Sequence, residues 1–136
     1  MINTELKSTI HEKIESGDFA PADIPAYLEL FCQVSNATGD VQDEVAGWDR
    51  KIQFQLDGNA DAWLAVAGGA FTKGAGRVEN PDLVLSLTPE NAARMFSGEK
   101  DAKAAYMSGQ LKIEGKIPDA LKLQTILGIV NEEIEY

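Results

Sequence analysis

Hydrophobic residues in the N-terminal part of the chain recur every three or four positions, which predicts two helices. The first spans residues 4–15, where Leu6, Ile10 and Ile14 form one stripe and a glycine follows at position 17. The second begins at residues 23–25, with a proline in its first turn, and ends near Asn36. Its apolar residues at helical spacing are Tyr27, Leu28, Phe31, Cys32 and Val34.

From residue 50 the hydrophobic pattern changes to a period of two, which predicts β-strands. In residues 50–57, Ile52, Phe54 and Leu56 alternate with polar residues such as Gln53, which the pattern places on a wet face. A turn at residues 57–59 follows.

Three further strands follow this turn along the chain. The segment AWLAVAGG is apolar at both parities and therefore belongs inside the sheet. The segment AFTKGAGRV is a strand weakened by glycines, and LVLSL at residues 83–87 places its leucines on one face. Their order along the chain predicts a meander.

The C-terminal part alternates helix and strand. Thr88 and Pro89 begin a helix that ends at Gly98, and residues 101–106 add one more turn. In a fifth strand, Leu111 and Ile113 share a face with Met107 and Gly109. A last helix begins at Pro118 and Asp119.

The last helix is more apolar than one contact with a sheet requires. Its main stripe comprises Ala120, Leu123, Leu127, Val130 and Ile134, joined by Ile126. At about 100° per residue, Leu121 and Ile129 fall outside this stripe. Three interpretations follow: the N-terminal helices cover these residues, or the residues border a ligand cavity, or they form a partner surface.

Length and composition indicate one soluble domain over residues 1–136, made of N-terminal helices (1–47) and a sheet with helices (48–136). The single cysteine, Cys32, excludes an internal disulfide and fits the cytoplasm, and no secretory signal or membrane span is recognisable. Twelve basic against 22 acidic residues give a formal net charge of -10. This charge disfavours nucleic acid and polybasic docking on anionic bilayers. We also expect no stable insertion into a membrane.

The motifs of catalysis are not recognisable in the sequence. The glycine-rich GGAFTKGAGR does not match a phosphate-binding loop, and one histidine with one cysteine makes a metal site improbable. His11 and Cys32 are better explained as surface and core residues than as a nucleophilic pair. Most carboxylates fall at turns, caps or wet helix positions. We therefore expect no enzyme activity and no cofactor.

One stretch resembles a known family. GQLKIEGKIPDALKLQ is similar to the signature of the sterol carrier protein type 2 family, the non-specific lipid-transfer domain. The resemblance extends upstream through NPDLVLSLTPENAARMFSGEKDAKAAYMSG and, more loosely, through AWLAVAGG to GWDRKIQFQLDG. It covers roughly residues 48–127.

The resemblance implies an α+β fold: a five-stranded, mostly antiparallel sheet with helices packed on one side and an apolar cavity between them. It implies non-enzymatic binding or carriage of a lipid, such as a fatty acid, an acyl-CoA, a sterol-like molecule or a phospholipid. Gln124 is the candidate for holding a polar head group. The expected ligand-binding residues are Met95, Phe96, Tyr106, Met107, Leu111, Ile113, Leu123, Gln124 and Leu127.

Two departures from the family pattern leave alternatives open. The chain ends in EIEY, so it carries no peroxisomal targeting tripeptide and a cytoplasmic location is expected. Residues 1–47 match the signature poorly, and they are interpreted as a lid over the cavity or as a dimer contact. The alternative function is a protein-interaction module whose apolar faces form a homodimer or dock on a lipid-handling enzyme, and an enzyme of lipid metabolism is the third hypothesis.

Overall fold

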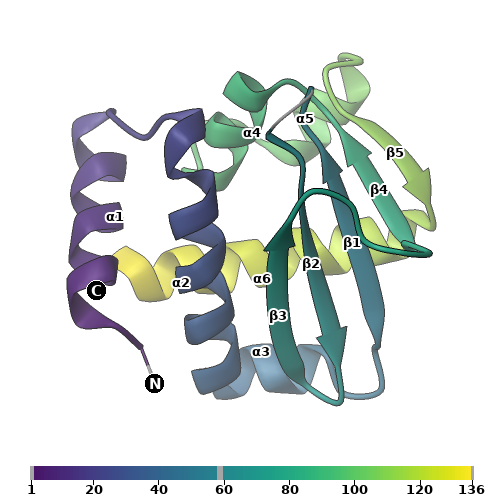
Figure 1. The fold of residues 1–136 in the computed structure, drawn as a ribbon, viewed down its shortest axis with the longest axis horizontal. Helices are drawn as coiled ribbons and strands as arrows, with labels where there is room; N and C mark the ends of the chain where they lie inside the picture. The colour runs from purple at the N-terminus through teal and green to yellow at the C-terminus, as the bar shows by residue number, and fades with distance from the viewer. Residues whose placement is uncertain (1, 58–59, 136) are drawn as a thin grey trace.

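The computed structural model describes residues 2–57 and 60–135. Within these residues, six helices and five strands form the fold (Figure 1), with a short 3-10 turn, η1, before α2. The helices are α1 (Thr4–Ser16), α2 (Ile24–Ala37), α3 (Gly39–Glu44), α4 (Pro89–Phe96), α5 (Ala102–Met107) and α6 (Ile117–Glu135). The strands are β1 (Arg50–Gln55), β2 (Ala62–Ala67), β3 (Ala70–Ala75), β4 (Leu83–Ser86) and β5 (Lys112–Gly115).

The five strands form one sheet in the order β3-β2-β1-β4-β5. The predicted meander is correct for β1 to β3, but β4 crosses over to pair with β1 in parallel instead of with β3. This position brings Leu83 and Leu85 into register with Ile52 and Phe54 in the middle of the sheet. The glycine-weakened β3 is left at an edge, where fewer backbone pairs depend on it. The other three strand pairs are antiparallel, so the expected fold class is confirmed.

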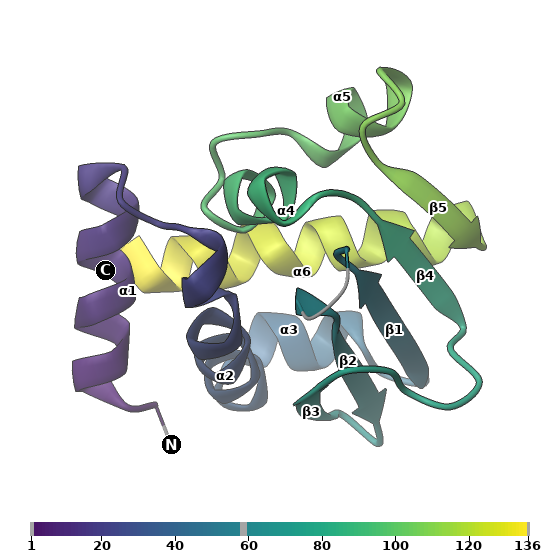
Figure 2. The ribbon, with the colours of Figure 1, turned by 45° about the horizontal axis from the view of Figure 1, so that its top comes forward.

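One face of the sheet carries the core. Phe54, Leu85 and Ile113 lie side by side on adjacent strands of this face. Helix α6 runs behind the sheet, from the end that holds β5 to the end that holds α1 (Figures 1 and 2). Its buried apolar side chains are those of Leu123, Ile126, Leu127, Val130 and Ile134.

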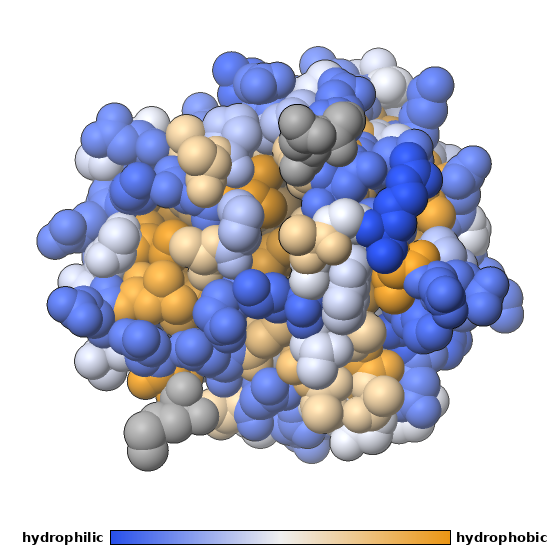
Figure 3. Space-filling model, viewed as in Figure 1, coloured by the Kyte–Doolittle hydropathy of each residue, from blue (hydrophilic) through white to orange (hydrophobic). Residues whose placement is uncertain are grey.

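The N-terminal helices complete this core at the end of the molecule near β3. The Tyr27 ring of α2 stacks on the Phe96 ring with centroids 5.1 Å apart, and the Tyr27 hydroxyl donates to Asn131 Oδ1 at 2.7 Å. In Figure 3, apolar atoms lie in the seam between α1 and α2 while most of the surrounding face is hydrophilic. The N-terminal helices therefore cover the C-terminal half of α6. This agrees with the first of the three interpretations of that helix for this half.

One local prediction in the C-terminal part was wrong, and one helix was missed. Met107 does not belong to the fifth strand, because it ends α5. Gly109 then adopts a left-handed φ of 81°, and the Gln110 amide donates to Ala105 O at 2.9 Å, which closes the helix before β5 begins. The six-residue α3 had no sequence signal strong enough to predict it. Residues 58–59 of the predicted turn lie outside the described residues.

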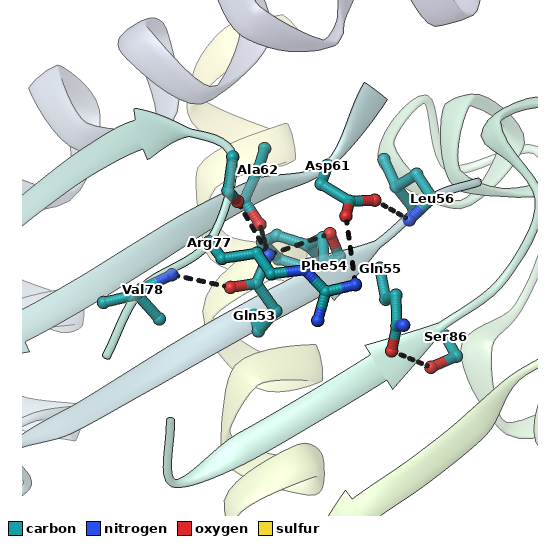
Figure 4. Close-up of polar contacts among 10 residues, drawn as sticks. Gln53, Phe54, Gln55, Leu56, Asp61, Ala62, Arg77, Val78 and Ser86 are labelled. Carbon is teal, nitrogen blue, oxygen red and sulfur yellow. Dashed lines mark hydrogen bonds and ion pairs between the residues drawn. The ribbon is translucent and has the colours of Figure 1, made fainter. Parts of the chain in front are cut away.

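Gln53 was predicted on a wet face, yet its side chain is only 3% exposed. The chain between β3 and β4 passes over it, and Figure 4 shows Gln53 between this crossover and β2. The amide Nε2 donates to Gly76 O at 2.8 Å and to Ala62 O at 3.0 Å, and Oε1 accepts from Val78 N at 2.8 Å. Gln53 therefore fastens the crossover that the parallel pairing of β1 and β4 requires.

Replacing Gln53 with leucine is expected to lower the free energy of unfolding by about 1–3 kcal/mol, because buried backbone groups of the crossover lose their partners. Urea unfolding measures this change. Gln55→Leu is the matched control, since Gln55 is half-buried on the same strand and accepts one hydrogen bond, from Ser86 Oγ at 3.2 Å. Equal losses in the two variants would contradict the role given to Gln53.

Candidate functional site

A groove of about 420 Å³ lies between α5, β5 and the first half of α6. In Figure 2 these elements are at the end of the molecule opposite α1. Side chains from α4 and β4 close the groove from below. All residues that line the groove therefore come from one continuous part of the chain, between positions 85 and 127.

The floor of the groove is apolar and buried. It is formed by Leu85, Met95, Leu111, Leu123 and Leu127. Ile113 and Ala120 are half-buried and form the walls above it. A ligand that reached the floor would exchange water for hydrocarbon on several sides.

The rim of the groove is apolar and exposed. Tyr106 and Met107 project from α5 on one side, and Ile117 and Leu121 project from α6 on the other. Among the described residues, these four are the exposed large apolar side chains, with exposed fractions of 46% (Tyr106), 76% (Met107), 42% (Ile117) and 53% (Leu121). Because a folded domain usually scatters such residues, their concentration at one opening indicates a binding surface.

Two polar side chains, those of Lys103 and Gln124, also line the groove. Gln124 Nε2 donates to Asp101 Oδ1 at 3.1 Å, and Asp101 Oδ2 accepts from Ala104 N at 3.2 Å as the N-cap of α5. This link joins the two sides of the groove. Of the six described residues of α5, Ala105 alone is buried.

The first turn of α6 is held by a buried carboxylate, which the sequence analysis did not single out. Asp119 accepts from Trp48 Nε1 and from Arg50 Nε, each at 2.9 Å, and the Arg50 guanidinium lies 5.6 Å from the centre of the Trp48 ring. Burial acts to raise the pKa of Asp119. The hydrogen bonds from Trp48 and Arg50 outweigh it, with the charges of Arg50 and Lys116, and hold the pKa below its usual value.

The structure brings together eight of the nine side chains predicted to contact a ligand. Met95, Tyr106, Met107, Leu111, Ile113, Leu123, Gln124 and Leu127 all line the groove. Phe96 does not, because it is one position, or about 100°, further around α4 than Met95. Its ring packs in the core, 5.3 Å from the centre of the Phe54 ring.

The groove contains six residues that the sequence analysis did not select as ligand contacts. They are Leu85, Ala102, Lys103, Ile117, Ala120 and Leu121. A signal existed for Leu121, which lies outside the main stripe of the last helix. Lys103 also shares a helical face with Tyr106 and Met107 at spacings of three and four residues.

Other reactive groups lie outside this groove. Burial raises the pKa of the Cys32 thiol to about 12, with the charge of Glu29 adding to the effect, so the thiol stays protonated at neutral pH. Within residues 2–57 and 60–135, no cluster of three His, Cys, Asp or Glu side chains could hold a metal ion. None of the helices described is long and apolar enough to cross a membrane.

A mixed sheet with helices around an apolar groove defines the class of this protein, an α+β domain with an apolar groove at one end. The sequence profile of the SCP-2 sterol transfer family matches residues 28–128, so the chain belongs to this family. The match begins within α2, well before the residues on which the sequence resemblance rested.

Comparison with individual proteins agrees with this assignment. The chain is 36% identical over 113 residues to hydroxysteroid dehydrogenase-like protein 2 of Homo sapiens, an alignment that covers 80% of this chain and 26% of the relative. The crystal structure of sterol carrier protein 2 superposes with a TM-score of 0.62 at 16% identity, covering 79% of this chain and 95% of that one. The solution structure of palmitated SCP2L2 from Aedes aegypti gives a TM-score of 0.56 at 14% identity, covering 74% and 90%. The chain spans about a quarter of the human relative.

Proposed function

We propose that this chain binds and carries an elongated lipid in the groove without transforming it. The observation that carries this proposal is the continuous apolar lining, from the buried floor to the exposed rim of α5 and α6. The chain's membership of a sterol transfer family supports it. In this proposal the eight predicted side chains at the groove, but not Phe96, contact the ligand.

A single acyl chain is the ligand that the groove favours most. Its lining is apolar except for Lys103 and Gln124, the polar groups that we expect to contact the head group. The comparison protein SCP2L2 is described as palmitated, which supports an acyl chain here. Burying about fifteen methylenes is worth at most about 12 kcal/mol, of which ordering and association remove half or more. The remainder of about 6 kcal/mol or less corresponds to a dissociation constant of about 40 μM or weaker.

We propose a function without catalysis because Asp119 is engaged and the Cys32 thiol is buried. Asp119, the buried carboxylate beside the groove, is held by Trp48 and Arg50, so it is not free to act as a base or a nucleophile. The protonated Cys32 thiol is part of the core. The dehydrogenase-like activity in the name of the curated relatives belongs to proteins of which this chain spans only a part. We place the chain in the cytoplasm, because its one thiol fits a reducing compartment.

A second candidate function is a protein-interaction module, favoured by the four exposed apolar side chains at the rim. In that case the rim would be covered by a second copy of the chain or by a lipid-handling enzyme. Light scattering across protein concentration separates the two candidates, because an apolar dimer interface would yield dimers at micromolar concentration.

Native mass spectrometry of gently purified protein tests the first candidate. We expect a discrete added mass that organic extraction identifies as fatty acid or phospholipid. Incubation with a long-chain fatty acid should restore this mass after delipidation. A clean apo mass after that incubation would contradict lipid carriage and favour the interaction module.

A further inference from the structure

A second pocket lies at the edge of the sheet opposite the groove. It has a volume of about 380 Å³ and is bordered by η1 (Pro21–Asp23), the first turns of α2, and the strands β2 and β3. The groove lies beside β5, whereas β3 is the other edge strand of the sheet. Among the described residues, the two cavities have no lining residue in common. The pocket is therefore separate from the groove proposed to carry lipid.

The pocket forms where α2 and β3, which are neighbours in Figure 1, are not fastened to each other. Near the end of α2, Asn36 Nδ2 donates to Phe71 O at 3.2 Å, and Asn36 Oδ1 accepts from Phe71 N at 2.8 Å. At the start of α2, the helix faces the strand through apolar side chains, those of Ile24, Leu28 and Ala75, and a pocket remains between them.

The walls of this pocket are mainly apolar, and part of their backbone is rigid. Pro21 and Pro25 hold two wall positions at a fixed φ, so little ordering is needed when a ligand enters. The volume falls in the range of about 300–1,000 Å³ that is usual for small-molecule sites. On the sheet side the lining side chains are small, those of Ala60, Ala62 and Ala75. The pocket thus suits a compact apolar body.

Lys73 brings a positive charge to the pocket. It is opposite Leu64 in the β2–β3 register, and Leu64 is opposite Ile52, so the Lys73 side chain leaves the sheet on the face that carries the core. Lys73 is half-buried there. Within residues 2–57 and 60–135, its ammonium group makes no ion pair. Because lysines are seldom buried without a partner, an anionic ligand would complete this arrangement.

The carboxylates next to the pocket are engaged with other groups. Asp61, which also lines the pocket, accepts from Leu56 N at 2.8 Å and lies 3.7 Å from Arg77 Nη2. Asp23, at the end of η1, is bound to Lys13 Nζ at 2.7 Å. The Lys73 ammonium is therefore available to an anionic group from outside the chain.

The edge of β3 offers a second donor. Phe71 N points away from β2, because it donates to Asn36, and in an antiparallel pair every second residue has this orientation. The backbone N–H of Lys73 therefore points to the same outer edge, beside the pocket. A carboxylate has two oxygens and can accept from the ammonium and from a backbone amide at the same time.

We propose that this pocket binds a compact apolar carboxylic acid in its ionised form. The carboxylate accepts a charge-assisted hydrogen bond from Lys73 Nζ, while the apolar body packs against Ile24, Leu28 and the two prolines. The apolar surroundings strengthen this contact relative to one at an open surface. The proposal goes beyond lipid carriage and does not depend on it.

The test is an NMR titration of the full chain with indole-3-acetate, and with indole-3-acetamide as an uncharged analogue of similar shape. We expect the acid to shift the amide signals of Leu28 and Lys73, with a dissociation constant of about a millimolar for about a dozen non-hydrogen atoms. The acetamide should bind about tenfold more weakly, because it lacks the charge-assisted hydrogen bond. Equal binding of the two probes, or shifts confined to the groove, would overturn the proposal.

The variant Lys73→Gln should bind indole-3-acetate about tenfold more weakly and indole-3-acetamide as wild type does. Lys112→Gln is the matched control, because Lys112 is an exposed lysine on the other edge strand, β5. It should bind both probes as wild type does. If Lys73→Gln kept the preference for the acid, Lys73 would serve only to keep the edge strand from pairing with other chains, and the proposed site would be wrong.

A variant in the groove separates this proposal from lipid carriage. Ala120→Trp places a large ring in the groove and should leave the titration with indole-3-acetate unchanged, because Ala120 does not line the second pocket. Loss of the acid in this variant would show that the acid occupies the groove and would overturn the proposal. A chain that binds no fatty acid but still prefers indole-3-acetate through Lys73 supports the second pocket and contradicts carriage alone.

Discussion

Replacing Ala120 with tryptophan is expected to weaken the binding of a long-chain fatty acid by about two orders of magnitude while the protein stays folded. Ala120 is half-buried and lines the groove from α6. An indole ring there would occupy space that an acyl chain needs. Excluding about four methylenes from burial costs about 3 kcal/mol, which corresponds to the expected loss.

Displacement of a fluorescent fatty acid measures this affinity. The matched control is Ala104→Trp, because Ala104 is exposed on α5 and does not line the groove. Circular dichroism should show the wild-type fold in both variants. If Ala120→Trp bound the fatty acid as tightly as Ala104→Trp does, the ligand would have to lie elsewhere.

Replacing Asp119 with alanine is expected to lower the free energy of unfolding by about 2–4 kcal/mol. The substitution removes the acceptor of Trp48 Nε1 and the partner of Arg50, which lies partly buried at 29% side-chain exposure. Removing one member of a buried charged pair costs more than the pair itself contributes, because the other member keeps its desolvation penalty. Partial exposure of Arg50 limits the loss.

The lowered pKa of Asp119 predicts that the free energy of unfolding depends on pH. Because the folded-state pKa of Asp119 is lowered, its contribution to stability is present above the unfolded-state pKa, near 3.8. The contribution is lost as the pH falls through the folded-state value. Urea unfolding from neutral pH to pH about 2 should therefore show a shallower acid dependence for Asp119→Ala than for wild type.

Asp43→Ala is the control for this series, because Asp43 is exposed on α3. It should change neither the stability at neutral pH nor the acid dependence. A wild-type acid dependence in Asp119→Ala would show that other carboxylates cause it.

Local patterns predicted most of the elements because local physics determines them. The stripe of α1 ends at Gly17, which adopts a left-handed φ of 78°, and Thr88 caps α4 by accepting from Asn91 N at 3.1 Å. Each signal lies within a few residues of the boundary that it sets. Periodicity thus predicted the strands of the sheet, and the family resemblance added the expectation of a cavity between the sheet and the helices.

Contacts between distant residues were the part that patterns could not predict. Gln53 reads as a surface residue until the crossover at Gly76 covers it, and Asp119 reads as a helix-start residue until Trp48 and Arg50 approach it. The pairing of β4 with β1 is also a contact between segments that are distant along the chain. In each case the partner is more than twenty positions away along the chain.

The candidate site was predicted because its residues lie in the region that resembles the family. Most selected side chains lie at the groove, but periodicity could not tell the groove face of α4 from its core face, so Phe96 was included with Met95. Lys103 was not selected because a lysine on a short helix normally indicates a solvated surface. That the groove residues contact a ligand stays a prediction.

The α5 side and the α6 side of the groove rim differ in how firmly they are attached, and this difference should affect the rate of ligand exchange. The α6 side is anchored by the ion pair between Asp119 and Arg50 of β1. In contrast, α5 buries the small Ala105 and is linked to α6 through the Asp101–Gln124 hydrogen bond. Segments with little buried surface open locally at low free-energy cost. The rate at which cargo enters and leaves should therefore follow the opening of α5, so the protein can exchange cargo quickly while its core stays closed.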